Sequence, residues 1–75
     1  LKISIEGHTD NTGDAGQNKK LSNDRANSVM NNIIAYGIDK SRLTAKGFGS
    51  ENPLFTNDSE QKKAKNRRVE LVKTN

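Results

Sequence analysis

The amino-acid sequence predicts an α/β domain, and three observations support this fold class. Residues 1–6 alternate between apolar and polar side chains, which is the period-two pattern of a half-buried strand. Residues 18–36 carry apolar side chains at helical spacing, and residues 43–46 alternate again. A strand, a helix and a second strand in this order favour a parallel strand pair joined by a right-handed crossover.

The first strand and the loop after it differ sharply in residue type. Leu1, Ile3 and Ile5 share one face, and Gly7 is expected to end the strand. Residues 9–13 are turn and capping residues, whose side chains bond to nearby backbone groups. We therefore expect a loop that holds its polar groups in fixed positions.

The expected helix runs from about Asn18 to Tyr36 and stops at a glycine, a residue that favours helix C-termini. One face of this helix is apolar and is interpreted as the core face. It comprises Leu21, Ala26, Val29, Met30, Ile33 and Ile34. Arg25 is four residues from both Leu21 and Val29, which places its charge at the margin of that face.

Shorter elements complete the expected chain. Residues 38–42 are a connection, residues 43–46 form the second strand, and Gly47-Phe48-Gly49 ends that strand. A loop then leads to Ser59, which is expected to cap a short helix over residues 60–65. The last strand is expected at residues 69–72, where apolar side chains again alternate.

Composition limits the chain to one small domain with a thin core, because 29% of its 75 residues are hydrophobic and only three are aromatic. We expect residues 1–75 to be a single domain cut from a longer protein. The absence of cysteine excludes disulfides and Cys-ligated zinc. No segment approaches the roughly 20 apolar residues of a membrane helix, so any membrane contact is expected through parts of the protein outside this chain.

Catalytic and metal sites are not expected. His8 lies near Asp10, but a metal site needs three or four ligands, and the sequence has no further histidine and no cysteine. Ser22 has no general base at a recognisable spacing. Glu6 and Asp10 flank a turn, unlike the paired carboxylates of a glycoside hydrolase. The sequence therefore predicts a protein that is not an enzyme and needs no cofactor.

The basic residues are concentrated near the end of the chain. The formal net charge is +4, and residues 62–73 hold six basic residues against one acidic residue, Glu70. Two interpretations remain open, a solvated basic face and a surface that binds nucleic acid. The scarcity of aromatic residues argues against nucleic acid, because unpaired bases are bound by stacking on aromatic rings.

Asp10 and Arg25 form the candidate site. Asp10 follows the first strand, at the edge where α/β units bind ligands, and it is the nearest candidate partner for the charge of Arg25. The residues alone leave two interpretations open. The pair binds a ligand, or it is a structural ion pair that anchors the loop to the helix, in which case the chain is a docking or oligomerisation module.

A set of motifs in constant order and spacing covers nearly the whole chain. They are Gly7-His8-Thr9-Asp10 with Gly13, Leu21-Ser22 followed by Arg25-Ala26 and Val29, Gly37-Ile38, Arg42-Leu43, Gly47-Phe48-Gly49, Pro53, Asn57, and Asn66-Arg67-Arg68-Val69-Glu70. In these motifs the chain resembles the OmpA-like C-terminal domains that bind peptidoglycan. The resemblance implies a two-layer α/β (α+β) domain with helices on one side of a mixed sheet.

The resemblance also implies a ligand, the diaminopimelate of the cell-wall stem peptide. By motif, the binding residues are Asp10 and Arg25, with Thr9, Asn11 and Asn18 near them; one of Arg67 and Arg68 lines the pocket rim or pairs with a carboxylate, and the other faces water. An amino-acid centre presents an ammonium group to Asp10 and a carboxylate to Arg25, which holds it with two parallel N–H bonds. Such a domain anchors an envelope membrane protein to the wall, at the periplasmic face of the outer membrane of a Gram-negative-type envelope.

Two departures from the family pattern affect these expectations. Lys62-Lys63 stands where the family has Gly-Arg, which keeps the charge and loses the guanidinium fork. The family also has a further strand and helix at the N-terminus that these 75 residues lack. That difference accounts for the thin core and makes a homodimer or a strand swap a possible way to complete it.

Overall fold

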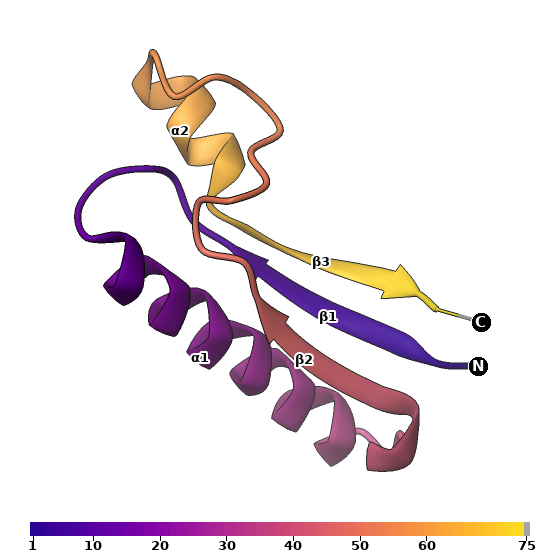
Figure 1. Ribbon diagram of the computed structural model, residues 1–75. Coiled ribbons are helices and arrows are strands. Elements are labelled where there is room, and N and C mark those ends of the chain that lie inside the picture. Colours follow the sequence, from indigo (N-terminus) through magenta and orange to yellow (C-terminus); the bar gives the residue numbers. More distant parts are fainter. Residues whose placement is uncertain (75) are drawn as a thin grey trace.

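The computed structural model describes residues 1–74, which form a three-stranded mixed sheet and two α-helices. The elements in chain order are β1 (Ile3–His8), α1 (Ala15–Ala35), the 3₁₀ turn η1 (Lys40–Arg42), β2 (Leu43–Gly47), α2 (Glu60–Asn66) and β3 (Arg68–Lys73). β1 is the central strand, parallel to β2 and antiparallel to β3 (Figure 1). The predicted fold class is confirmed.

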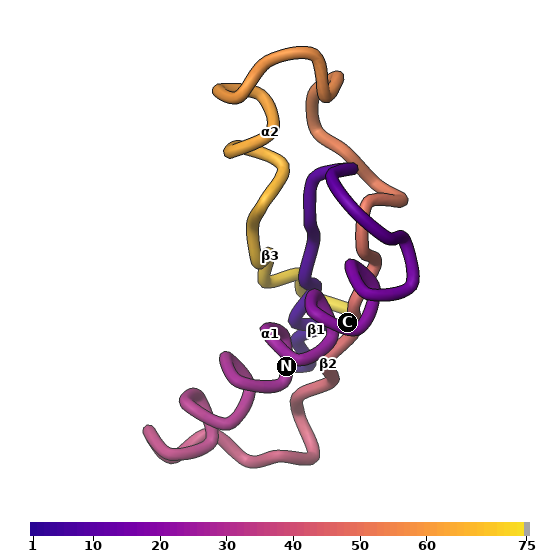
Figure 2. Tube along the Cα trace, turned by 90° about the vertical axis from the view of Figure 1, so that its left-hand side faces the viewer, coloured from indigo at the N-terminus to yellow at the C-terminus, as the bar shows by residue number. Residues whose placement is uncertain are grey.

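The two helices take different positions relative to the sheet. α1 packs across β1 and β2 and covers one face, whereas α2 stands beyond the ends of the strands, above the carboxyl end of β1 (Figures 1 and 2). Within residues 1–74, neither helix is long and apolar enough to cross a membrane. α2 therefore adds to the loop end of the domain, where the candidate site is expected.

The core lies between α1 and the sheet and is small. Its buried hydrophobic residues are Ile5, Ala26 and Leu43. Partly buried apolar residues surround them, namely Ile3, Val29, Met30, Ile33, Ile34, Ala45 and Val69. Leu21, predicted on the core face, is 43% exposed. The buried stripe of α1 is centred on Ser22 and Ala26, and one residue of helix turns the Leu21 side chain about 100° away from it.

β1 continues to His8, past the glycine that the residue pattern predicts as its end. A Cβ atom on Gly7 would lie 2.1 Å from the carbonyl oxygen of Ser22, and one on Gly47 would lie 2.3 Å from the amide nitrogen of Asn23. Gly7 and Gly47 are opposite one another in the β1–β2 register. This glycine pair is required for the close approach of α1 to the sheet, so Gly7 has a packing role inside the strand.

Capping side chains set where the helices begin. α1 begins at Ala15 rather than at Asn18, because the carboxylate of Asp14 accepts a hydrogen bond of 2.8 Å from the Gln17 N–H and extends the first turn. α2 begins directly after Ser59, as predicted, and the Ser59 hydroxyl caps its first turn. Both caps are short polar side chains that satisfy N–H groups with no partner inside the helix.

Asn66, at the end of α2, is fully buried and holds the preceding loop. Its side-chain oxygen accepts hydrogen bonds from the backbone N–H of Leu54 (2.9 Å) and Phe55 (3.1 Å). Its amide nitrogen donates to the Phe55 carbonyl oxygen and to Asn57 Oδ1, each at 3.0 Å. One buried side chain thus forms four hydrogen bonds to the preceding loop.

Asn66→Asp is expected to lower the free energy of unfolding by about 3 kcal/mol at pH 7, because it removes both donors and buries a charge. The loss is expected to shrink near pH 3, where the new carboxyl group is protonated. Urea unfolding at the two pH values measures both effects. Asn31→Asp, on the exposed side of α1, makes the same charge change and is the control, with an expected effect within about 0.5 kcal/mol. Equal stability of the two variants at pH 7 would contradict the role of Asn66.

Candidate functional site

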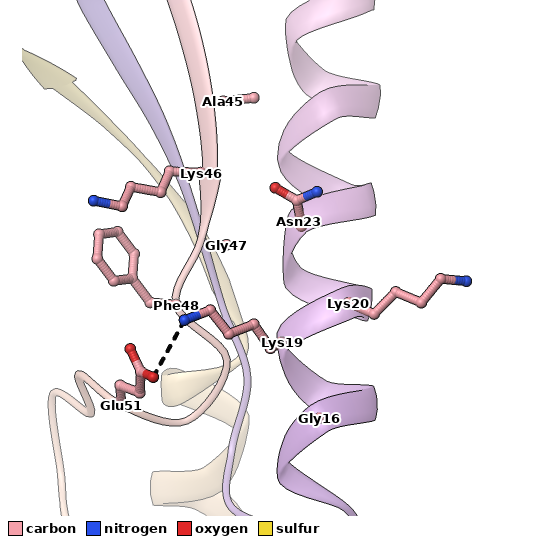
Figure 3. A pocket seen from close by; sticks show the side chains of 9 residues that line it. All are labelled: Gly16, Lys19, Lys20, Asn23, Ala45, Lys46, Gly47, Phe48 and Glu51. Carbon is pink, nitrogen blue, oxygen red and sulfur yellow. Dashed lines mark hydrogen bonds and ion pairs between the residues drawn. The ribbon is translucent and has the colours of Figure 1, made fainter.

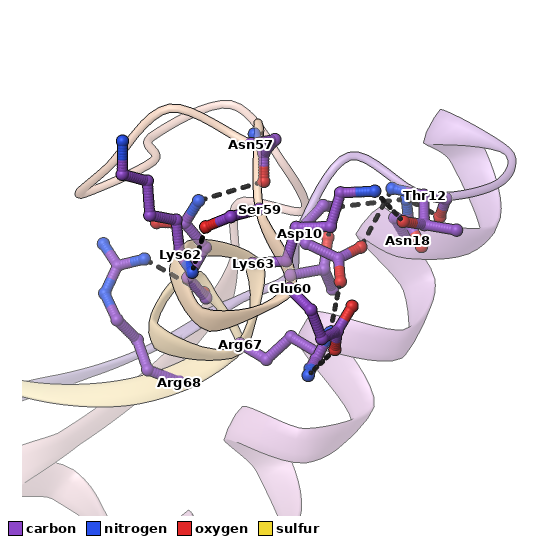
Figure 4. Close-up of polar contacts among 12 residues, drawn as sticks. Asp10, Thr12, Asn18, Asn57, Ser59, Glu60, Lys62, Lys63, Arg67 and Arg68 are labelled. Carbon is purple, nitrogen blue, oxygen red and sulfur yellow. Dashed lines mark hydrogen bonds and ion pairs between the residues drawn. The ribbon is translucent and has the colours of Figure 1, made fainter.

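The candidate site lies past the carboxyl end of β1, where the loop after His8 meets α2 and the start of β3 (Figure 4). The buried side chain of Asp10 is its centre. Asp10 Oδ1 accepts a hydrogen bond of 2.9 Å from the Thr12 N–H, and Oδ2 accepts one of 2.6 Å from Arg67 Nη1. Arg67 Nη2 also donates to Glu60 Oε1 at 2.9 Å. The carboxylate is therefore held from both sides.

These contacts keep the Asp10 carboxyl group ionised. The Thr12 N–H and the Arg67 guanidinium lower the pKa of Asp10 from its ordinary value, and they outweigh the effect of burial, which raises it. The carboxylates of Glu60 and Asp10 raise the pKa of Arg67 in turn. At neutral pH the site therefore contains a negative carboxylate held in a fixed position.

Arg67, and not Arg25, is the guanidinium partner of Asp10, so the predicted contact between Asp10 and Arg25 is wrong. β3 pairs antiparallel with β1 and places Arg68 opposite His8, which brings the preceding residue, Arg67, beside the loop that carries Asp10. Arg25 lies about three turns into α1 and is exposed. Within residues 1–74 it makes no hydrogen bond or ion pair.

The other predicted residues hold the loop or lie on its surface. Thr9 is buried, and its hydroxyl donates to the Asp10 carbonyl oxygen at 2.8 Å. Asn18, in the first turn of α1, donates to the carbonyl oxygens of Thr12 (3.0 Å) and Asp10 (3.5 Å). Asn11 is exposed beside Asp10. The structure therefore brings Thr9, Asn11, Asn18 and Arg67 around Asp10 and leaves Arg25 apart.

Two further basic residues, Lys63 and Arg68, make contacts near the site. Lys63 reaches from α2 to the loop, where its Nζ lies 3.3 Å from Thr12 Oγ1 (Figure 4). The sequence signal for this contact was that Lys63 stands where the family has an arginine. For Arg67 and Arg68 the prediction was that one lines the pocket rim or pairs with a carboxylate and that the other faces water. Arg68 is half-buried and binds the Glu70 carboxylate and two backbone carbonyl oxygens. Both arginines therefore pair with carboxylates, and the prediction that one of them only faces water is wrong.

His8 is buried next to the site, on the opposite side of the sheet from α1. Its ring stacks on Phe48 at 5.3 Å between centroids, and its Nε2 lies 3.7 Å from Glu70 Oε2. Among the described residues its Nδ1 has no hydrogen-bond partner. Burial and the nearby Arg68 charge lower the pKa of His8, against the opposing effects of Glu70 and Glu6. The folded domain therefore favours the neutral imidazole.

The lowered pKa of His8 predicts a loss of stability in mild acid. As the pH falls through the unfolded-state pKa of about 6.5, the unfolded chain takes up the proton first, so folding stability declines until the folded-state pKa is passed. The melting temperature measured by circular dichroism is expected to fall by a few degrees between pH 7 and pH 5. His8→Gln cannot titrate, so its melting temperature is expected to lack the part of this fall that comes from His8. An equal fall in melting temperature for the parent and for His8→Gln would contradict the role of His8.

The amino-acid sequence of this chain is similar to those of known proteins. The OmpA family matches residues 1–67. The probable lipoprotein YiaD of Escherichia coli (strain K12) is 42% identical over 70 residues, which are 93% of this chain and 32% of YiaD. The peptidoglycan-binding protein ArfA of Mycobacterium tuberculosis (strain ATCC 25618 / H37Rv) is 42% identical over 71 residues, which are 95% of this chain and 22% of ArfA.

The fold also has close counterparts among solved structures. The crystal structure of the peptidoglycan-associated lipoprotein from Burkholderia pseudomallei matches with a TM-score of 0.91 and 32% sequence identity, over 95% of this chain and 60% of that one. The chain thus spans only part of each protein that it resembles. Since the family match extends over nearly the whole chain and the fold agrees with it, the chain belongs to the OmpA family.

Proposed function

We propose that this chain is a non-catalytic domain that binds peptidoglycan through the diaminopimelate of the stem peptide. The observation that carries the proposal is the ionised Asp10 carboxylate at the end of β1, together with the exposed and unpaired guanidinium of Arg25 within the described chain. ArfA and the Burkholderia lipoprotein, both named for peptidoglycan, support it. None of the three proteins compared above has the name of an enzyme.

The charges of the site suit a zwitterionic ligand. Asp10 accepts hydrogen bonds from the ammonium group of diaminopimelate, and Arg25 donates two parallel bonds to the neighbouring carboxylate. Because Asp10 and Arg25 are not paired with each other, no ion pair between them has to break when the ligand enters. Thr9 and Asn18 keep the loop in position, and the exposed Asn11 offers a further polar group to the ligand.

The basic segment of residues 62–73 supports this function over nucleic-acid binding, because most of its charges are already engaged inside the domain. The contacts are Lys62–Asp58, Lys63–Thr12, Arg67–Asp10, Arg67–Glu60 and Arg68–Glu70, with Lys65 over the ring of Phe55. A nucleic-acid surface needs several cations free to contact phosphates. Arg67 and Lys63 instead contact Asp10 and the loop that follows it.

The proposed role in the cell is to anchor an envelope membrane protein to the wall, on the periplasmic face of the outer membrane. The lipoprotein names of YiaD and the Burkholderia protein support an envelope location. Charge-assisted hydrogen bonds contribute about 1.5–3 kcal/mol each, and ordering costs reduce their sum, so one site is expected to bind with modest affinity. Many stem peptides on one polymer raise retention through avidity.

An NMR titration of the chain with a diaminopimelate-containing stem peptide tests the proposal. Saturable shifts are expected at Thr9, Asp10, Asn11 and Arg25. The control is the same peptide with lysine in place of diaminopimelate, which keeps the side-chain amine and lacks the second carboxylate. Shifts with the first peptide alone would support recognition of the zwitterionic centre, whereas a folded chain that responds to neither would overturn the proposal.

A further inference from the structure

A concave surface is lined by residues that do not include Asp10. It is an open groove of about 690 Å³ between α1 and the outer side of β2 (Figure 3). Its lining residues from α1 are Gly16, Lys19, Lys20 and Asn23, and those from β2 and the following turn are Ala45, Lys46, Gly47, Phe48 and Glu51. Gly16, Lys19 and Asn23 are three or four positions apart and so lie on one flank of the helix. None of these residues belongs to the proposed diaminopimelate site.

The floor of this groove includes the free edge of the sheet. β2 is an edge strand of the described chain, since the strand order is β2-β1-β3. The Phe48 N–H donates to the Gly7 carbonyl oxygen of β1 at 3.0 Å. Because backbone groups alternate in direction along a strand, those of Ala45 and Gly47 point away from β1, toward the groove. An edge of this kind is a template for a further strand.

The groove is positively charged. Lys19, Lys20 and Lys46 are among its lining residues, with one carboxylate, that of Glu51, 3.4 Å from Lys19. The Lys20 side chain points away from β2 (Figure 3) and lies 4.0 Å from Asp24, so Lys19 and Lys46 carry the charge at the strand edge. The side chains of Lys19 and Lys20 are 58% and 83% exposed. Lys46 projects from β2 itself, with its Nζ 5.1 Å from the centre of the Phe48 ring. Lysines at a strand edge oppose pairing with a second copy of the same edge and attract an acidic strand.

We propose that this groove binds an extended acidic peptide segment of a partner protein, which adds as a strand to the edge of β2. The partner's backbone bonds to the outward N–H and C=O groups of Ala45 and Gly47. Successive side chains of an added strand alternate between the two faces of the sheet, so its carboxylates lie near Lys19 on the α1 face and near Lys46 on the opposite face. The main-chain bonds provide affinity, and the lysines select an acidic sequence. This surface is separate from the diaminopimelate site, so the two bind independently.

The test is an NMR titration of the chain with a capped six-residue peptide of two glutamates, two valines and two glutamates, in which adjacent glutamates place carboxylates on both faces of an added strand. Saturable shifts and slowed hydrogen exchange are expected at the amides of Ala45 and Gly47. Two further peptides serve as controls, one with lysine in place of glutamate and one with N-methylated valines, which keeps the charge and loses the donors for strand pairing. Each is expected to bind at least about tenfold more weakly. Equal binding of either control peptide would overturn the proposal.

Charge-matched variants distinguish binding of the acidic peptide in the groove from a general attraction between the peptide and the basic chain. The double variant Lys19→Glu, Lys46→Glu is expected to bind the acidic peptide about tenfold more weakly. The control Lys40→Glu, Lys73→Glu makes the same change in net charge outside the groove and is expected to bind normally. Equal losses in both would overturn the proposal. Glu51→Gln, which frees Lys19, is expected to increase the affinity a few-fold.

Two further outcomes distinguish the possible occupants. Asp10→Asn is expected to lose diaminopimelate and keep the acidic peptide, so failure of one function does not imply failure of the other. Concentration-dependent shifts of Ala45 and Gly47 without any peptide would assign the edge to a second copy of the chain and overturn the proposal. A folded chain with no response to the acidic peptide would also overturn it.

Discussion

Arg25→Lys is expected to lose affinity for a diaminopimelate-containing peptide almost as completely as Arg25→Ala. A lysine keeps the positive charge but cannot donate two parallel N–H bonds to one carboxylate. The loss of one charge-assisted contact corresponds to about 10- to 150-fold in the dissociation constant. The stability of both variants is expected to stay within about 0.5 kcal/mol of the parent, because Arg25 is exposed.

Isothermal titration calorimetry or NMR titration of the two variants measures this difference. Normal binding by Arg25→Lys would show that a positive charge alone suffices. It would contradict the two parallel hydrogen bonds proposed for Arg25. Lys20→Ala, also exposed on α1 but outside the diaminopimelate site, is the control for loss of a basic residue and is expected to bind normally.

Asp10→Asn tests the proposed contact with the ammonium group of the ligand. The asparagine oxygen can still accept the Thr12 N–H, so the loop is expected to remain folded, while the attraction for the ammonium group is lost. Binding is expected to weaken by a factor similar to that of Arg25→Ala. If Asp10→Asn unfolded instead, the carboxylate and Arg67 would be a structural ion pair and the ligand assignment would fail.

Gly7→Ala is expected to have the largest effect on stability. The new methyl group would lie 2.1 Å from the Ser22 carbonyl oxygen and 2.9 Å from its carbonyl carbon, so backbone on both sides must move. Overpacking of this kind costs about 3 kcal/mol or more. A domain of this size has a total stability of roughly 4–11 kcal/mol, and its thin core favours the low end. At that low end about 1 kcal/mol or less would remain, so the urea unfolding midpoint is expected to fall close to zero denaturant.

Gly16→Ala is the matched control for Gly7→Ala. Its new methyl group would meet only the flexible Asp14 carboxylate, at 3.1 Å, and alanine is favoured over glycine inside a helix by about 0.5–1 kcal/mol. This variant is expected to be as stable as the parent or more so. A Gly7→Ala chain with near-normal stability would mean that α1 can lift away from the sheet without cost.

Residue alternation and helix capping predicted the helices and strands well where neighbouring residues alone determine them. The alternation of apolar residues identified all three strands to within about two residues, and the Ser59 cap located the start of α2. The start of α1 was placed too late because the Asp14 cap was overlooked. The end of β1 was placed too early because glycine was interpreted as a break, and its real role depends on a helix that is distant in sequence.

The contacts around Asp10 were predicted in part. The Asp10 loop and its supporting residues Thr9 and Asn18 were identified from the motif that contains them, and the structure gathers them as expected. The contact between Asp10 and Arg25 was wrong, and the contact between Asp10 and Arg67 was missed. Residues 10 and 67 are 57 positions apart, so nothing in the local pattern relates one to the other.

The sequence by itself determined the elements, the family and the loop that carries Asp10, because these depend on short-range periodicity, capping and motif spacing. Only the tertiary structure decided which arginine meets that carboxylate, because the antiparallel register of β3 on β1 brings Arg67 to the end of the strand. It also decided that Gly7 and Gly47 hold α1 close to the sheet. Side-chain pairs across distant elements follow from register and packing, which no local pattern specifies.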